Sequence, residues 1–210
     1  MLRFLRPYLA RMLLPVGRGL ARVGVTPTAV TLTGAVGVTV SSLAFYPQGK
    51  LYIGSVVVTA FVLCDMLDGA VARVSNGTSK WGAFLDSTLD RVSDAAILAG
   101  LLLWFTGEGA DPMLAGLTLF CMVSGFGVSY VKARAEGLGV NCDVGVAGRS
   151  ERLVLVLVAA GIGGLDVPYV LPVGLWLLAV LSGVTVVQRL LETYNRLTHP
   201  NQHAGNAGTH

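Results

Sequence analysis

The chain has 210 residues, 53% of them hydrophobic and only 13% charged, and its formal net charge is +3. So apolar a composition excludes a water-soluble domain and a disordered chain, and no nucleic-acid partner is expected. The sequence predicts an all-α integral membrane protein, because long uncharged runs cross a bilayer as helices.

The first 22 residues are expected to form an amphipathic helix that lies in the membrane interface. Arginines are spread among Leu, Phe and Met in MLRFLRPYLARMLLPVGRGLARV, which has neither an uninterrupted apolar core nor a clear cleavage site. Arginines on one face and apolar side chains on the other suit an interfacial helix attracted to anionic lipid. A solvated leader helix is the alternative.

Six transmembrane helices follow. Uncharged runs over 23–49, 112–131 and 167–188 each reach the roughly 18–20 residues that cross the hydrocarbon core. Three shorter apolar runs become full spans when their helices continue into the charged segments beside them. The expected spans are 28–47, 51–75, 81–106, 112–137, 149–165 and 168–196.

These spans form one membrane domain over residues 23–197, without an internal repeat or a separate soluble domain. The polar tail HPNQHAGNAGTH has little to bury, so residues 198–210 are expected to be disordered.

The basic residues predict the orientation. With six spans, fourteen of the fifteen Lys and Arg residues fall on one side, and only Lys50 falls on the other. The positive-inside rule then places both termini and the charged loops on the cytoplasmic side of a multi-pass protein of the cell membrane.

Five aspartates lie between strongly apolar segments, where carboxylates are costly unless they bind, pair or transfer something. Asp65 and Asp68 have i, i+3 spacing, Asp86 and Asp90 have i, i+4 spacing, and Asp94 adds one more turn. Residues at these spacings share one face of a helix. Two acidic helix faces are therefore expected to meet at membrane depth.

Divalent cations would relieve the repulsion among four facing carboxylates. Oxygen-only ligation suits Mg²⁺ or Mn²⁺ better than zinc. Four shared aspartates can hold two ions about 3.5–4 Å apart, an arrangement used in phosphoryl displacement. Asp94 is better explained as a structural partner of Arg73 or Arg91. A divalent-cation transporter is the rival from another functional class, because transporters also place carboxylates at mid-membrane.

Basic residues at the cytoplasmic ends of the last three spans are candidates for a second binding site. Arg189 interrupts the apolar stretch VTVVQRLL, and an arginine there favours an anion. Convergence of several cations would form a phosphate-binding pocket beside the metals. Arg149 stays open between this role and ordinary positive-inside charge. The candidate cations are Lys132, Arg134, Arg149, Arg152 and Arg189.

Read in full, the acidic segment is Asp65-x2-Asp68-Gly69-x2-Ala72-Arg73-x8-Gly82-x3-Asp86-x3-Asp90. This resembles the signature of the CDP-alcohol phosphotransferase family at all eight defined positions. The expected six spans are similar to the family fold, so the likeness covers nearly the whole chain.

The resemblance implies an enzyme of phospholipid biosynthesis that moves a phosphatidyl-type group from a CDP-linked lipid to an alcohol and releases CMP. It implies that Asp65, Asp68, Asp86 and Asp90 ligate two metal ions and that Asp90 is also the general base. It further implies a homodimer. The residues that it assigns to the CDP-lipid are Thr28, Ala29, Val30, Thr31, Gly69, Ala72, Arg73, Ser79 and Gly82.

Within the family, the chain is most similar to the actinobacterial phosphatidylinositol phosphate synthases, which use inositol 1-phosphate as acceptor. The segments FVLCDMLDGAVAR and SYVKARAEG, the pair Glu151-Arg152 and VVQRL around Arg189 carry this likeness. CDP-diacylglycerol, inositol 1-phosphate and membrane lipids are the partners that it implies. It also implies that Lys132, Arg134, Arg152 and Arg189 shape the site for the phosphate of the acceptor. A phosphatidylglycerophosphate synthase that uses glycerol 3-phosphate is the alternative, because it needs the same core and also a phosphate pocket.

Overall fold

The computed structural model describes residues 26–65 and 79–198, together with Gly19 and Gly24. Within these residues the regular structure is helical and contains no strand, which confirms the all-α prediction. The longer elements, in chain order, are α2 (Pro27–Phe45), α3 (Leu51–Asp65), α5 (Lys80–Thr106), α6 (Pro112–Gly137), α7 (Arg149–Gly163) and α8 (Val170–Thr198). A short 3-10 helix, η2 (Tyr46–Gln48), joins α2 to α3.

Local sequence signals set the first residues of the helices. Thr26 caps α2, its hydroxyl accepting a hydrogen bond of 3.2 Å from the amide of Ala29, and a proline occupies the first turn. Asp111 caps α6 in the same way, 2.9 Å from the amide of Leu114. Side-chain oxygens at these positions satisfy amides that lack a partner within the helix, and proline suits the first helical turn.

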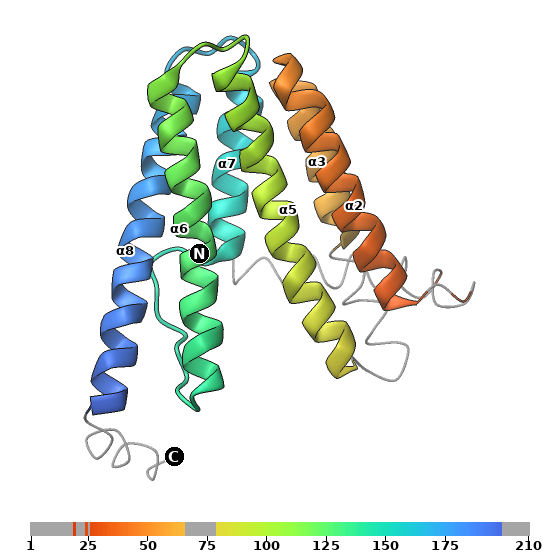
Figure 1. Cartoon of the computed structure of the whole chain (residues 1–210). Coiled ribbons are helices and arrows are strands. Elements are labelled where there is room, and N and C mark those ends of the chain that lie inside the picture. The colour runs from red at the N-terminus through yellow and green to blue at the C-terminus, as the bar shows by residue number, and fades with distance from the viewer. Residues whose placement is uncertain (1–18, 20–23, 25, 66–78, 199–210) are drawn as a thin grey trace.

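The helices form a bundle in which α5 lies between α2 and α3 on one side and α6, α7 and α8 on the other (Figure 1). Helix α2 packs against α3 and α5, helix α6 packs against α5 and α8, and α7 packs against α3 and α8. The connections 46–50, 107–111 and 164–169 lie at one end of the bundle, and segment 138–148 lies at the other (Figure 1). The end that holds segment 138–148 also holds the first turns of α2 and α5 and the last turn of α3.

Small residues allow the helices to approach closely. A Cβ atom on Gly100 of α5 would lie 2.5 Å from the carbonyl oxygen of Ser42 of α2. A Cβ atom on Gly174 of α8 would lie 2.3 Å from the Cβ atom of Ala159 of α7. Close backbone approach through small residues is how helices associate in lipid, where no hydrophobic force pushes them together.

The outer surface of the bundle is apolar. The side chains of Val40, Val123 and Val173 are each about three-fifths exposed, at 61%, 62% and 61%. Large apolar side chains that face outward around a helical bundle match the hydrocarbon of a bilayer. The protein is therefore a membrane protein.

Three of the described helices are long and apolar enough to cross a membrane: α2 extended by η2, α6 and α8. Helix α3 is a shorter apolar helix of 15 residues up to Asp65, and the rest of the expected span 51–75 lies outside the described residues. Helix α7 also has 15 residues. Six transmembrane spans therefore stay a prediction. The expected interfacial helix 1–22, apart from Gly19, and the tail 198–210, apart from Thr198, lie outside the described residues.

Candidate active site

Three carboxylates from two helices meet near one end of the bundle. Asp65 is the last described residue of α3, and Asp86 and Asp90 lie one turn apart on α5. Each offers a carboxylate oxygen, and the three oxygens lie within 4.8 Å of one another. The three residues are partly buried. The sequence analysis expected two acidic helix faces to meet, and the structure brings Asp65 of α3 together with Asp86 and Asp90 of α5.

This cluster fits an oxygen-preferring divalent cation. It consists only of carboxylates, and hard cations such as Mg²⁺ and Mn²⁺ prefer carboxylate oxygens over sulfur or imidazole nitrogen. Like charges at these separations repel unless a cation or a proton lies among them. Asp68, the fourth aspartate that the sequence predicts here, lies outside the described residues.

Gly34 of α2 makes room for Asp65. A Cβ atom on Gly34 would lie 2.9 Å from the Cβ atom of Asp65 and 3.0 Å from its Oδ1 atom. The sequence analysis did not identify Gly34 as a site residue, because nothing in TLTGAVG distinguishes it from other glycines in apolar helices. The contact itself depends on the packing of α2 against α3.

Arg149, in the first turn of α7, joins two aspartates of α5. Its Nη1 atom lies 2.8 Å from Oδ1 of Asp90. Its Nε atom lies 3.2 and 3.1 Å from the two carboxylate oxygens of Asp94, and its Nη2 atom lies 3.0 Å from Oδ1 of Asp94. The sequence suggested Arg73 or Arg91 as the partner of Asp94, whereas the structure pairs Asp94 with Arg149. Arg91 instead lies 3.7 Å from Oδ2 of Asp90.

The four expected acceptor cations have different surroundings. Arg152 is 7% exposed, and within the described part of the chain its Nη1 atom has no hydrogen-bond partner. Its charge interacts with those of Asp94 and Arg189. Lys132 pairs with Asp143 and lies 3.5 Å from Glu136. Arg134 is exposed in the last turn of α6.

The guanidinium of Arg189, in α8, donates hydrogen bonds to two backbone carbonyls. Its Nε atom donates to the carbonyl of Val144 at 3.0 Å, and its Nη1 atom donates to the carbonyl of Val128 at 2.6 Å. These contacts tie α8 to segment 138–148 and to α6. The residue therefore has a structural role that its position in an apolar helix did not indicate.

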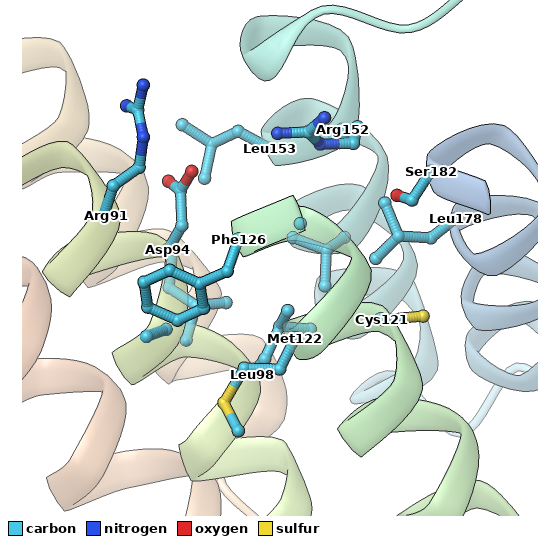
Figure 2. Close-up of a pocket in the computed structure, with 14 residues that line it drawn as sticks. Arg91, Asp94, Leu98, Cys121, Met122, Phe126, Arg152, Leu153, Leu178 and Ser182 are labelled. Carbon is cyan, nitrogen blue, oxygen red and sulfur yellow. The ribbon is translucent and has the colours of Figure 1, made fainter. Parts of the chain in front are cut away.

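A small cavity, with a volume of about 40 Å³, extends from this charged region into the bundle (Figure 2). Arg91, Asp94 and Arg152 lie at one end of it, and Leu98 and Met122 lie toward the other (Figure 2). The hydroxyl of Ser182 lines it and, among the described residues, has no hydrogen-bond partner. Two residues of its lining, Arg152 and Ser182, thus have a buried polar atom without a hydrogen-bond partner among the described residues.

The residues expected to contact the CDP-lipid lie on the first turns of two helices. Thr28, Ala29, Val30 and Thr31 begin α2, where the hydroxyl of Thr31 donates to the carbonyl of Pro27 at 3.1 Å. Ser79 caps α5, its hydroxyl accepting a hydrogen bond of 2.9 Å from the amide of Gly82. The cap is a sufficient structural reason for a hydroxyl at position 79. Three further expected contacts, Gly69, Ala72 and Arg73, lie outside the described residues.

Comparison with known proteins gives a consistent result over almost the whole chain. The sequence profile of the CDP-alcohol phosphatidyltransferase family matches residues 24–188. A phosphatidylinositol phosphate synthase of Streptomyces avermitilis is 46% identical over 196 residues, which cover 90% of this chain and 80% of the relative. One of Mycobacterium tuberculosis is 47% identical over 190 residues, 88% of this chain and 87% of the relative.

Solved structures of the phosphatidylinositol phosphate synthase of Mycobacterium tuberculosis have the same fold. A complex with manganese and citrate has a TM-score of 0.83 and 46% identity, covering 87% of this chain and 88% of that chain. A complex with CDP-DAG also has a TM-score of 0.83 and 46% identity, covering 88% of this chain and 94% of that chain. With this agreement in sequence and fold, the chain belongs to the CDP-alcohol phosphatidyltransferase family and is an enzyme of that class.

Proposed function

We propose that the protein transfers the phosphatidyl group of CDP-diacylglycerol to inositol 1-phosphate, giving phosphatidylinositol phosphate and CMP. The observation that carries this proposal is the meeting of Asp65, Asp86 and Asp90. It occurs in a chain that is 46% identical, over 90% of its length, to a phosphatidylinositol phosphate synthase. A solved relative that contains CDP-DAG supports the donor, and the names of the relatives support the acceptor.

The metal site in this proposal consists of Asp65, Asp68, Asp86 and Asp90, which together would hold two Mg²⁺ or Mn²⁺ ions. Bound divalent ions neutralise the pyrophosphate and the charge that develops on the departing CMP. A relative solved with manganese supports a divalent ion in this family. The aspartates would hold these ions in place beside the pyrophosphate of the donor.

Asp90 acts as the general base in the transfer step. The acceptor hydroxyl attacks the phosphorus of the phosphatidyl group, and its proton passes to the carboxylate of Asp90. The new bond joins the acceptor oxygen to phosphorus, and the bond between phosphorus and the oxygen of CMP breaks. Positioning and electrostatics suffice for this kind of transfer, so no covalent intermediate with the protein is needed.

The first turns of α2 and α5 are the proposed site of the CDP group, with Thr28 to Thr31, Ser79 and Gly82. The N-termini of helices favour anions, which supports this placement for a pyrophosphate. The proposed CDP site also includes Gly69, Ala72 and Arg73, and their assignment rests on the family signature alone.

The acceptor phosphate is assigned to the cationic side of the site. The buried guanidinium of Arg152 supports this, because a buried cation with an unsatisfied donor favours an anionic partner. Arg189, Lys132 and Arg134 complete the proposed set. Lys132 already pairs with the carboxylates of Glu136 and Asp143, and the phosphate would have to replace them. Lys132 therefore contributes least in this proposal.

The proposed assembly is a homodimer of six-span subunits within residues 23–197, with an interfacial helix over 1–22 and a disordered tail over 198–210. Both termini and the active site face the cytoplasm of the cell membrane. Helix α5 has 27 residues, so at about 1.5 Å per residue it is long enough to span despite its charges. The acyl chains of the donor can then remain in the bilayer while the soluble acceptor enters from the cytoplasm.

The test is CMP release by the full-length protein in lipid nanodiscs with CDP-diacylglycerol and Mg²⁺. We expect release with inositol 1-phosphate and none with glycerol 3-phosphate, serine or free inositol, and loss of release with EDTA. Asp90→Asn is the matched inactive variant, expected to lower kcat about 10²–10⁴-fold by removing the general base. Its binding of CDP-diacylglycerol should persist.

Other outcomes would redirect the proposal. Release with glycerol 3-phosphate alone would keep the chemistry but identify a phosphatidylglycerophosphate synthase. Wild-type turnover by Asp90→Asn would remove that residue from the base role. Metal flux into liposomes without any CMP release would instead favour a divalent-cation transporter.

A further inference from the structure

The guanidinium of Arg149 has all three of its nitrogens engaged by α5. Its Nε and Nη2 atoms contact the carboxylate of Asp94, and Nη1 contacts Oδ1 of Asp90 at 2.8 Å. The Nη2 atom also lies 3.5 Å from the backbone carbonyl of Asp90. Two-point contact fixes the plane of a guanidinium, so Asp94 determines where the remaining nitrogen points.

The Nη1 atom of Arg149 gives the carboxylate of Asp90 a close contact. Rotation of an aspartate carboxylate about its last torsion is broad, so the carboxylate needs a partner to hold one orientation. Arg149 supplies that partner at Oδ1, whereas Arg91 lies 3.7 Å from Oδ2, beyond the length of a normal hydrogen bond. The carboxylate is thus held at one oxygen, and Oδ2 has no equally close contact from Arg91.

The backbone that carries Arg149 is itself anchored. Segment 138–148 leads directly into α7, and its last residues hydrogen-bond to α8. The amide of Val146 donates to Oε1 of Gln188 at 3.1 Å, and the amide of Ala147 lies 3.4 Å from the hydroxyl of Thr185. The guanidinium therefore starts from a fixed point and reaches across to α5.

Ion pairing with both aspartates also offsets their cost. Asp90 and Asp94 are i, i+4 neighbours, and their side chains are 17% and 26% exposed. Like charges at this spacing repel each other, and partial burial increases the penalty. One arginine between them offsets this repulsion, because it contacts both carboxylates.

We propose that Arg149, held in place by Asp94, is a positioning residue that fixes the orientation of the Asp90 carboxylate for the proton transfer, an inference that rests on the proposed function. Arg149 does not touch the reacting atoms in this role. Its effect belongs in the turnover step rather than in substrate affinity.

The test compares Arg149→Ala, Arg149→Lys and Asp94→Asn in the full-length protein in nanodiscs. We expect Arg149→Ala to lower kcat about 10–100-fold, the usual effect of losing a partner that orients a functional carboxylate. KM for CDP-diacylglycerol and for inositol 1-phosphate should stay within about threefold, because the loss is confined to the transition state.

The conservative variants separate positioning from charge. Arg149→Lys should recover only part of kcat, because one ammonium lacks the fork that contacts both aspartates. Asp94→Asn should lower kcat less than Arg149→Ala, and the double variant should lose no more than Arg149→Ala alone, since both residues act through one contact. Arg196→Ala, which removes an arginine paired with Glu192 far along α8, is the matched control and should keep wild-type kcat.

A second readout does not depend on turnover. The electron paramagnetic resonance spectrum of Mn²⁺ bound to the protein should change its line shape in Arg149→Ala and stay unchanged in Arg196→Ala, because Asp90 is a proposed ligand. If Arg149 only ties α5 to α7, the substitutions should lower the midpoint of thermal unfolding, but folded Arg149→Lys and Asp94→Asn should keep the wild-type kcat. That result overturns the inference. Wild-type protein that releases no CMP would contradict the proposed function, and an unchanged Mn²⁺ spectrum in Arg149→Ala would then overturn the inference separately.

Discussion

At the scale of single residues, the acidic cluster depends on a glycine, which leaves room for one of the aspartates, as much as on the carboxylates. Asp65 reaches Asp86 and Asp90 from a different helix, and Gly34 lies against it. A methyl group on Gly34 would be 2.9 Å from the Cβ atom of Asp65, closer than side chains pack without moving. The position of one ligand is thus coupled to the packing of α2.

Gly34→Ala is therefore expected to displace Asp65. We expect kcat to fall about 10–100-fold, since a shift near 1 Å in a catalytic group has effects of this size. The Mn²⁺ affinity, measured by isothermal titration, should weaken as well. Gly116→Ala in α6 is the control, because a Cβ atom there meets no described atom within 4 Å. Equal activity of the two variants would contradict the coupling.

At the scale of elements, segment 138–148 joins α6 to α7 and contacts α8, the three helices that carry the proposed acceptor cations. Arg189 of α8 donates to the carbonyl of Val144 in this segment and to Val128 of α6. The same segment leads into α7, which carries Arg149 and Arg152. Gly145 contributes a backbone with φ of 142° beside Thr185, a conformation and a close approach that favour glycine. The acceptor side of the site thus depends on how this segment is held.

Arg189→Ala is expected to raise KM for inositol 1-phosphate about tenfold or more, because it removes a cation and two hydrogen bonds made by a charged group. KM for CDP-diacylglycerol should change much less, as steady-state kinetics of the two substrates would reveal. Gln188→Ala is the matched control, since it removes only an uncharged contact with the same segment. If Gln188→Ala raised KM for the acceptor as much, the charge of Arg189 would have no role in binding the phosphate.

At the scale of the whole molecule, the apolar exterior and the distribution of charge define how the protein lies in a membrane. Lys50 is exposed in the connection that leads into α3. This connection lies at the end of the bundle opposite to segment 138–148, whereas the C-terminal end of α8 lies at the same end as that segment (Figure 1). The positive-inside rule assigns these two ends to opposite sides of the bilayer.

Labelling of single cysteines tests this orientation. In a cysteine-free background, Lys50→Cys should react with a membrane-impermeant maleimide in intact cells, and Asn195→Cys should react only after lysis. Both positions are exposed, so a lack of labelling reports the membrane and not burial. The reverse pattern would place the aspartates outside the cytoplasm, away from the supply of CDP-linked lipid.

The sequence by itself determined the helical class, the approximate helix ranges, the pairing of Asp86 with Asp90 on one face, and the family. These depend on hydropathy, on helical periodicity and on a signature with fixed spacing, all of which are local properties of the chain. The caps at Thr26, Ser79 and Asp111 are also readable from neighbouring residues.

Only the tertiary structure decided which distant residues meet. The contact of Gly34 with Asp65, the bridge from Arg149 to Asp90 and Asp94, and the backbone contacts of Arg189 join residues from different helices. Long arginine side chains reach several neighbours, so spacing along the chain leaves their partners open. Packing selects among these neighbours, because a charge in apolar surroundings is stable where the fold supplies a counter-charge or a carbonyl oxygen.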